Sequence, residues 1–188
     1  MVPAPFIVVV DANVLFPLTL RDTVLRAAAA GFYQLRWSAD ILDEMERNLN
    51  VKGRIPPDKA ARLRSTMEGF FPEAEVTDDA PLIAAMQNDP KDRHVAAAAV
   101  KAGAQVIATS NLKDFAPLPA GIEAQSPDEF LCNLFDLDPS AFVGDAEGTG
   151  RRSRESAHDV REPAGAALAR CPRPGSGRSP IRGRGDVP

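Results

Sequence analysis

Apolar and polar positions alternate along the chain in blocks that predict strands followed by helices. The first block, "FIVVV" at residues 6–10, is apolar at every position, as is typical of a strand buried on both faces of a parallel sheet. The stretch "TVLRAAAAGF" that follows it has helical character. A second strand, "QLRWS", precedes a helix at "ADILDEMERNL", in which the apolar residues form one stripe. Residues 6–49 therefore predict two strand–helix units.

The same pattern continues along the rest of the chain. It predicts a helix at residues 57–69, a helix at 93–103 that ends at a glycine, a buried strand at 105–110, a strand at 122–126 and a helix at 127–135. Repeated alternation of strands and helices with short connections indicates a parallel sheet covered on both faces by helices.

Composition narrows the class of protein. The chain has 188 residues, of which 44% are hydrophobic and 26% charged, as is typical of one soluble globular domain. The longest apolar run, at residues 6–10, is too short to cross a bilayer, and the N-terminal segment lacks the basic start of a secretory signal. We therefore expect no membrane association and a cytoplasmic location.

The last quarter of the chain differs in composition from the rest. Residues 1–142 carry 13 Lys and Arg against 20 Asp and Glu, whereas residues 143–188 carry 9 Arg against 6 Asp and Glu and no aromatic residue. Such a segment cannot bury enough apolar area to offset its ordering entropy. We predict a folded domain at residues 1–142 and an Arg/Gly/Pro-rich, disordered tail at 143–188. A nucleic-acid-binding arm and translation in a different reading frame are two further explanations of the tail.

Polar side chains follow two of the predicted strands. Asp11 and Asn13 come directly after the first strand. The stretch "VIATSNLKDF" places three more polar residues after a later strand, namely Thr109, Asn111 and Asp114. Because ligands of parallel α/β sheets bind beyond the carboxyl ends of the strands, these groups can converge on one crevice.

Two helices supply further carboxylates. Asp92 lies in line with the apolar stripe of its helix, and an acid on a buried face needs a partner. The alternative is a structural role, because an Asp in the first turn interacts favourably with the helix dipole. Glu44 lies at one margin of its apolar stripe, where it is either a site residue or a boundary residue of a solvated face.

Together these carboxylates form an all-oxygen set without a His or Cys cluster. Oxygen ligands suit Mg²⁺ or Mn²⁺. Such an ion activates the attacking water and neutralises phosphate charge in phosphodiester cleavage. The two histidines offer no competing site, since we expect His94 to be a surface residue and His158 lies in the tail.

Four motifs carry a resemblance to a known family. They are "VVVDANVLF", "SADILDEMERNL", "DPKDRHVAAAA" and "VIATSNLKDF", in this order along the predicted domain. The sequence resembles the PIN-domain family, and within it the VapC-like ribonuclease toxins of type II toxin–antitoxin systems. The resemblance implies a three-layer α/β/α sandwich with a mainly parallel sheet and a Mg²⁺- or Mn²⁺-dependent endoribonuclease activity. It also implies a cognate antitoxin as partner, and we expect a homodimer.

Matching positions suggest which residues hold the metal. The resemblance implies that Asp11, Glu44 and Asp92 are ligands. Many family members have an Asp directly after the Thr-Gly or Thr-Arg pair of the last motif, where this chain has Asn111. We therefore expect Asp114 to complete the site, with Asn111 assisting through its amide oxygen or through water.

Neighbouring polar residues are expected to orient the ligands. Asn13 and Thr109 are suited to hydrogen bonding with the carboxylates. Asp89 is a further possible ligand, although its place in "NDP" favours a turn role.

A run of basic residues is the predicted RNA-contacting surface. Within an 18-residue span that holds a single acidic residue, the predicted set is Arg47, Lys52, Arg54, Arg62 and Arg64. A solvated helical face explains the same run equally well.

Two other functions compete with a ribonuclease. Phosphatases of the haloacid dehalogenase type also place an Asp after their first strand. Their motif at this point is D-x-D, whereas this chain has Asn13 in place of the second Asp. A PIN-fold protein that has lost catalysis and acts as an interaction module is the second, supported by Asn111 and opposed by the three retained acids.

Overall fold

A computed structural model of the chain describes residues 6–52 and 55–137. At its centre lie five parallel strands: β1 (Ile7–Val10), β2 (Gln34–Ser38), β3 (Glu75–Val76), β4 (Val106–Ala108) and β5 (Glu123–Gln125). They form one sheet in the order β3-β2-β1-β4-β5. β1 is therefore the central strand, with Val9 opposite Arg36 of β2 on one side and opposite Ile107 of β4 on the other.

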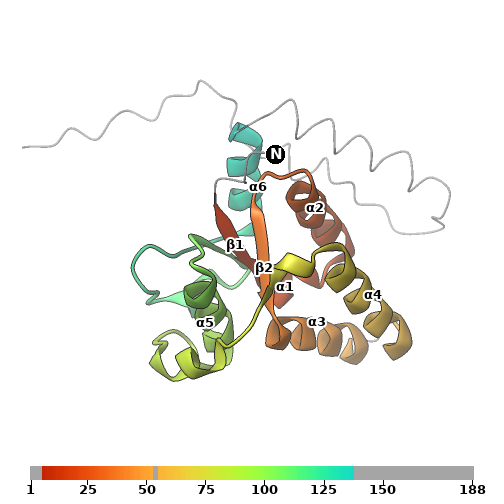
Figure 1. The fold of residues 1–188 in the computed structure, drawn as a ribbon, viewed down its shortest axis with the longest axis horizontal. Helices are drawn as coiled ribbons and strands as arrows, with labels where there is room; N and C mark the ends of the chain where they lie inside the picture. The colour runs from red at the N-terminus through yellow and green to blue at the C-terminus, as the bar shows by residue number, and fades with distance from the viewer. Residues whose placement is uncertain (1–5, 53–54, 138–188) are drawn as a thin grey trace, which may run out of the picture.

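Helices cover both faces of this sheet. The α-helices are α1 (Ala12–Leu15), α2 (Leu18–Ala29), α3 (Ala39–Val51), α4 (Pro57–Phe70), α5 (Arg93–Ala102) and α6 (Pro127–Leu137). Four short 3-10 helices lie between them: η1 (Pro72–Ala74), η2 (Ala80–Ala85), η3 (Pro90–Asp92) and η4 (Leu112–Phe115). α5 packs on β1, β2 and β4 from one side, and α1 to α4 lie on the other side (Figure 1). The predicted α/β architecture with a parallel sheet is confirmed.

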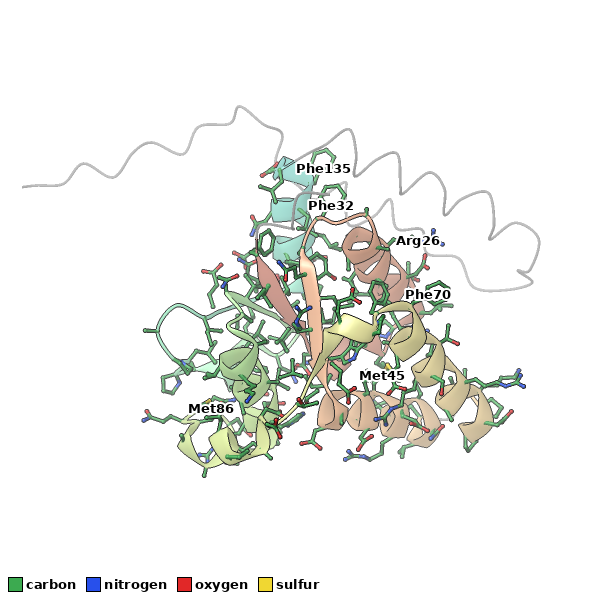
Figure 2. The ribbon with its side chains drawn as sticks, in the orientation of Figure 1. Arg26, Phe32, Met45, Phe70, Met86 and Phe135 are labelled. Atoms are coloured by element: carbon green, nitrogen blue, oxygen red, sulfur yellow. The ribbon has the colours of Figure 1, made fainter. Side chains whose placement is uncertain are left out.

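Burial explains why β1 has no polar position. Val8, Val9 and Val10 are fully buried because helices cover both sides of the central strand. Side chains fill the space between the sheet and the helices, with Met45 of α3 among them (Figure 2). This packing fixes the carboxyl end of β1, where the chain turns into α1 at Asp11.

Several local features differ from the pattern-based prediction, among them the short helix α1, which was not predicted. β3 is only two residues long and carries no periodic signal, so it was not predicted. α2 begins at Leu18, directly after Pro17, and is longer than the predicted helix. Gly103 ends α5 with a φ of 65°, in the left-handed region expected of a helix C-terminus.

Across residues 6–52 and 55–137, none of the helices combines the length and the apolar character that a membrane span requires. The predicted tail at 143–188 and the predicted RNA contact Arg54 lie outside the described residues.

Candidate active site

The carboxyl ends of β1 and β4 meet and bring their polar residues together. The backbone N–H of Asp11 donates to the carbonyl of Ala108 at 3.0 Å, which places Asp11 beside Thr109. Both residues are buried. Oδ2 of Asp11 accepts a hydrogen bond from the Thr109 hydroxyl at 2.7 Å and one from Nδ2 of Asn13 at 2.6 Å. One carboxylate oxygen of Asp11 is thus fixed by two donors.

Asn13 joins the two strand ends. Its Oδ1 accepts from the backbone N–H of Ser110 at 2.9 Å, and its Nδ2 lies 3.1 Å from the Thr109 hydroxyl oxygen. The Thr109 hydroxyl also accepts from the backbone N–H of Asn111 at 3.1 Å. Asn111 therefore enters this network through its backbone, while the residue as a whole is exposed.

Burial and charge act in opposite directions on Asp11. Burial raises the pKa of its carboxyl, the hydrogen bond from Thr109 lowers it, and the charge of Glu44 raises it again. The net result is a raised pKa. Glu44 on α3 is thus close enough to Asp11 for their charges to interact.

Asp92 lies where η3 passes into α5, and it is the least satisfied acid of the group. Its Oδ2 is buried and has no hydrogen-bond partner. The pKa of the Asp92 carboxyl is raised to about 6, mainly by burial and then by the charge of Asp11. Lys91 partly opposes this rise, and Asp114 and Glu44 contribute smaller increases to it. All four predicted carboxylates therefore interact electrostatically around Asp92.

Backbone contacts tie Asp114 to the segment that precedes α5. The carbonyl of Asp114 accepts from the backbone N–H of Asp89 at 3.0 Å and from Nδ2 of Asn88 at 3.4 Å. The Asp114 carboxylate pairs with the ammonium of Lys91 at 3.0 Å. Asp89 itself acts in the turn, where its Oδ1 accepts from the backbone N–H of Lys91 at 3.1 Å.

Glu44 and His94 connect α3 to α5. Nε2 of His94 lies 3.5 Å from Oε2 of Glu44, at the outer limit of hydrogen bonding, and the two form an ion pair when the imidazole is protonated. Contact with His94 lowers the pKa of Glu44 although burial opposes this. Burial by itself lowers the pKa of His94, but Glu44 outweighs it and the net pKa is raised. The prediction that His94 is a surface residue is wrong, since its side chain is only 15% exposed.

A protein-family model, that of the PIN domain, matches residues 7–113 of the chain. This is more than half of the chain, and the match contains Asp11, Glu44 and Asp92. The chain belongs to the PIN-domain family. This assignment leaves the haloacid dehalogenase-type phosphatase without support.

A curated relative matches this chain over a shorter stretch. It is named "Putative ribonuclease VapC50", from Mycobacterium tuberculosis, and is 56% identical over 59 residues, which is 30% of this chain and 35% of that protein. The match thus spans about a third of the length of the relative. No solved structure gives a significant match.

A cleft of about 280 Å³ lies beside the acidic residues of the PIN domain, and its lining carries charges of both signs. It is lined by Asp40, Asp43, Glu44, Arg47, Lys91 and His94. Glu44 belongs both to this cleft and to the acidic group. Arg47 is the member of the predicted RNA-contacting set that lines it.

The other described members of that basic set lie in different surroundings. Lys52 places its ammonium 4.5 Å from the centre of the Phe16 ring. Arg64 of α4 pairs with three carboxylates, those of Asp43, Glu46 and Glu68. Its charge is already neutralised, so Arg64 is poorly suited to bind RNA.

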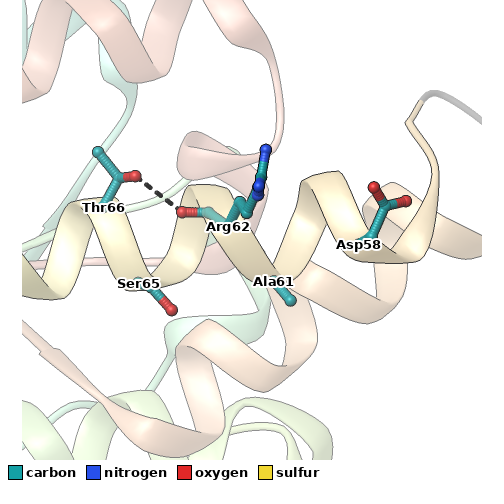
Figure 3. Close-up of a pocket in the computed structure, with 5 residues that line it drawn as sticks. All are labelled: Asp58, Ala61, Arg62, Ser65 and Thr66. Carbon is teal, nitrogen blue, oxygen red and sulfur yellow. Dashed lines mark hydrogen bonds between the residues drawn. The ribbon is translucent and has the colours of Figure 1, made fainter.

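Arg62 faces a separate, wide and open pocket of about 530 Å³ on α4. Figure 3 shows its lining, which comes from one helix: Asp58, Ala61, Arg62, Ser65 and Thr66. The Thr66 hydroxyl bonds to the carbonyl of Arg62 within the helix. None of the four predicted carboxylates lines this pocket, so the pocket that Arg62 lines is separate from the acidic group.

The acidic group fits a divalent cation in its chemistry rather than as a ready-made cage. Among the described residues, no three Asp, Glu, His or Cys side chains are arranged so that they hold a metal ion as they stand. Asp11 is instead turned to Thr109, and Asp114 to Lys91. Oδ2 of Asp92 is buried and accepts no hydrogen bond, and three further acids raise the pKa of this carboxyl, an effect that Lys91 opposes only in part. A divalent cation relieves such an environment. The donor set is entirely oxygen, as Mg²⁺ and Mn²⁺ prefer.

Proposed function

We propose that this PIN domain is a metal-dependent endoribonuclease. The observation that carries the proposal is that the buried Oδ2 of Asp92 accepts no hydrogen bond. Burial and the three neighbouring acids raise the pKa of the Asp92 carboxyl. A carboxylate kept in this state is costly to the fold unless a cation compensates it. Asp11, Glu44, Asp92 and Asp114 are the proposed ligands of Mg²⁺ or Mn²⁺.

A divalent ion bound there supplies activation of the attacking water and neutralisation of the phosphate charge. Neighbouring residues of the chain position the proposed ligands. Thr109 and Asn13 hold Oδ2 of Asp11 in place, and Oδ1 is the proposed ligand atom. Asp114, rather than Asn111, is the proposed fourth ligand, because the charge of Asp114 raises the pKa of Asp92. Asn111 instead donates its backbone N–H to the Thr109 hydroxyl.

The cleft between α3 and α5 is the proposed place of the RNA backbone next to the acids. Arg47 lines it and carries the positive charge that a phosphate requires. Arg62 and Lys52 are proposed as more distant contacts.

A toxin role is the finer part of the proposal. It is supported by the partial match to a protein named as a VapC-type ribonuclease, together with the four motifs. On this proposal the chain acts in the cytoplasm as a homodimer and is held inactive by a cognate antitoxin. A gene for a small DNA-binding antitoxin is expected next to this one, and expression of the chain alone should arrest growth. Normal growth without such a neighbour would contradict the toxin role and leave the ribonuclease intact.

The ribonuclease is tested with the purified full chain and total RNA. We expect cleavage with Mg²⁺ or Mn²⁺, none with EDTA, and none for Asp11→Asn, whose circular dichroism should match the wild type. The matched control is Asp22→Asn, which removes a half-buried acid of α2 that pairs with Arg26. Full cleavage by Asp11→Asn, or cleavage in EDTA, would contradict the proposal. A folded wild type that neither binds metal nor cleaves RNA would favour the interaction module instead.

A further inference from the structure

Lys91 stands out among the basic residues because it contacts two of the proposed metal ligands at once. Its ammonium lies 3.0 Å from Oδ2 of Asp114 and 3.9 Å from Oδ2 of Asp92. No other Lys or Arg of the described residues forms an ion pair with either carboxylate. The orphaned oxygen of Asp92 therefore has Lys91 as its nearest cationic neighbour.

We propose that Lys91 is an internal counter-ion that a divalent cation displaces from Asp114 and Asp92, and that the released ammonium then binds a phosphate oxygen of the RNA. The inference rests on the proposed ribonuclease function. It assigns to Lys91 two successive partners of the same charge, first carboxylate and then phosphate.

Displacement follows from the charges at the site. The ammonium and a divalent ion compete for the same oxygen of Asp114, and as like charges they also repel each other at short range. Lys91 thus weakens metal binding in the wild type. Removing its charge should strengthen metal binding, whereas removing the charge of a ligand should weaken it.

The surroundings give the released side chain a place to go. Lys91 is 62% exposed, so its flexible stem is free to swing without repacking the core. It also lines the cleft between α3 and α5 together with Arg47 and His94. A phosphate in this cleft would meet Arg47 from α3 and Lys91 from the segment before α5.

The test compares three full-length proteins: wild type, Lys91→Gln and Lys113→Gln. Lys113 is an exposed residue that directly precedes Asp114. Lys113→Gln is a matched control because it removes the same charge as Lys91→Gln. Binding of Mn²⁺ alone to EDTA-stripped protein is measured by calorimetry. We expect Lys91→Gln to bind Mn²⁺ about threefold to tenfold more tightly than both other proteins. Lys91→Arg, which keeps the charge, should return toward the wild-type affinity.

The second readout is steady-state cleavage of a mixed-sequence, single-stranded RNA oligonucleotide at saturating Mn²⁺. Lys91→Gln should raise KM about threefold to tenfold with a smaller change in kcat, while Lys113→Gln should leave both near wild type. Unchanged or weaker Mn²⁺ binding by Lys91→Gln would overturn the counter-ion role. Tighter Mn²⁺ binding with an unchanged KM would overturn the phosphate contact. A wild type that binds no Mn²⁺ and cleaves no RNA would overturn the ribonuclease proposal together with this one.

Discussion

Two halves of the acidic site are built in different ways. At the strand ends, Asp11 has two hydrogen-bond donors on one oxygen, and Asn13 and Thr109 join β1 to β4. At the start of α5, Asp92 has no hydrogen bond on its buried Oδ2, and Asp114 is held by the exposed Lys91. One carboxylate oxygen in the strand-end half is held by two donors, whereas the buried Oδ2 in the helix-start half accepts no hydrogen bond.

This difference indicates that the strand-end half stabilises the fold, whereas the helix-start half is suited to bind a cation. A satisfied polar network fixes the position of its members and contributes to stability. A buried carboxylate oxygen that accepts no hydrogen bond destabilises the fold until a cation binds close to it. We therefore expect substitutions at the strand ends to lower stability and substitutions at the helix start to raise it in metal-free protein.

The largest stability change is expected at the strand ends. Thr109→Val keeps the shape of the side chain but removes the hydroxyl that donates to Asp11 and accepts from Asn111. Because this leaves buried polar groups unpaired, we expect the free energy of unfolding in urea to fall by about 2 kcal/mol. Thr109→Ser retains the hydroxyl and serves as the control. If valine and serine variants unfolded alike, the strand-end network would not be a stabilising element.

An opposite and smaller change is expected for Asp92→Asn in EDTA. The folded carboxyl has a pKa of about 6, against 3.8 for the ordinary group, so the folded state holds more protons between these values. The free energy of unfolding of the wild type therefore falls as pH rises through this window, and the cost is fully present above it. Asparagine does not ionise, and we expect the variant to be more stable by about 1–2 kcal/mol at about pH 7.5.

The pH series gives this prediction its control. The advantage of Asp92→Asn should shrink as pH is lowered toward 4, and Mn²⁺ should raise the melting temperature of the wild type but not that of the variant. Glu73→Gln removes an exposed acid on η1 and should show neither effect. A less stable Asp92→Asn at neutral pH would mean that the Asp92 carboxylate is already compensated within the protein.

The smallest change is expected at Arg64, whose partners lie outside the acidic site. Its side chain is partly exposed and pairs with Asp43, Glu46 and Glu68 across α3 and α4. Arg64→Gln should lower the free energy of unfolding by about 1 kcal/mol or less, because ion pairs near the surface contribute little. It should leave the KM for RNA unchanged, as measured in the oligonucleotide assay. A raised KM would return Arg64 to the RNA-contacting set and extend the site toward α4.

Much of the fold was predictable because each long element carries its own periodicity. The apolar run of β1 and the stripes of α3 and α5 lie where the pattern placed them, and Gly103 ends α5 as expected. β3 was missed because two residues carry no period and its pairing with β2 depends on contacts distant in sequence.

The candidate site was predictable in part. Asp11 and Thr109 lie beside each other, as expected for residues that follow parallel strands ending at one edge of a sheet, and β1 and β4 are neighbours. The role of His94 was not predictable. Its partner Glu44 lies fifty positions earlier on another helix, and no spacing rule within one helix connects them.

The sequence by itself determined the strand–helix alternation, the acids at the strand and helix ends, and the motifs of the PIN-domain family. These are local properties, set by side-chain periodicity and by the residue types at each element end. Only the tertiary structure decided that Oδ2 of Asp11 accepts two hydrogen bonds while Oδ2 of Asp92 accepts none, and that Lys91 pairs with Asp114. Hydrogen bonding and charge compensation depend on which atoms meet across α3, α5 and the ends of β1 and β4, and that is fixed by packing between segments far apart in the chain.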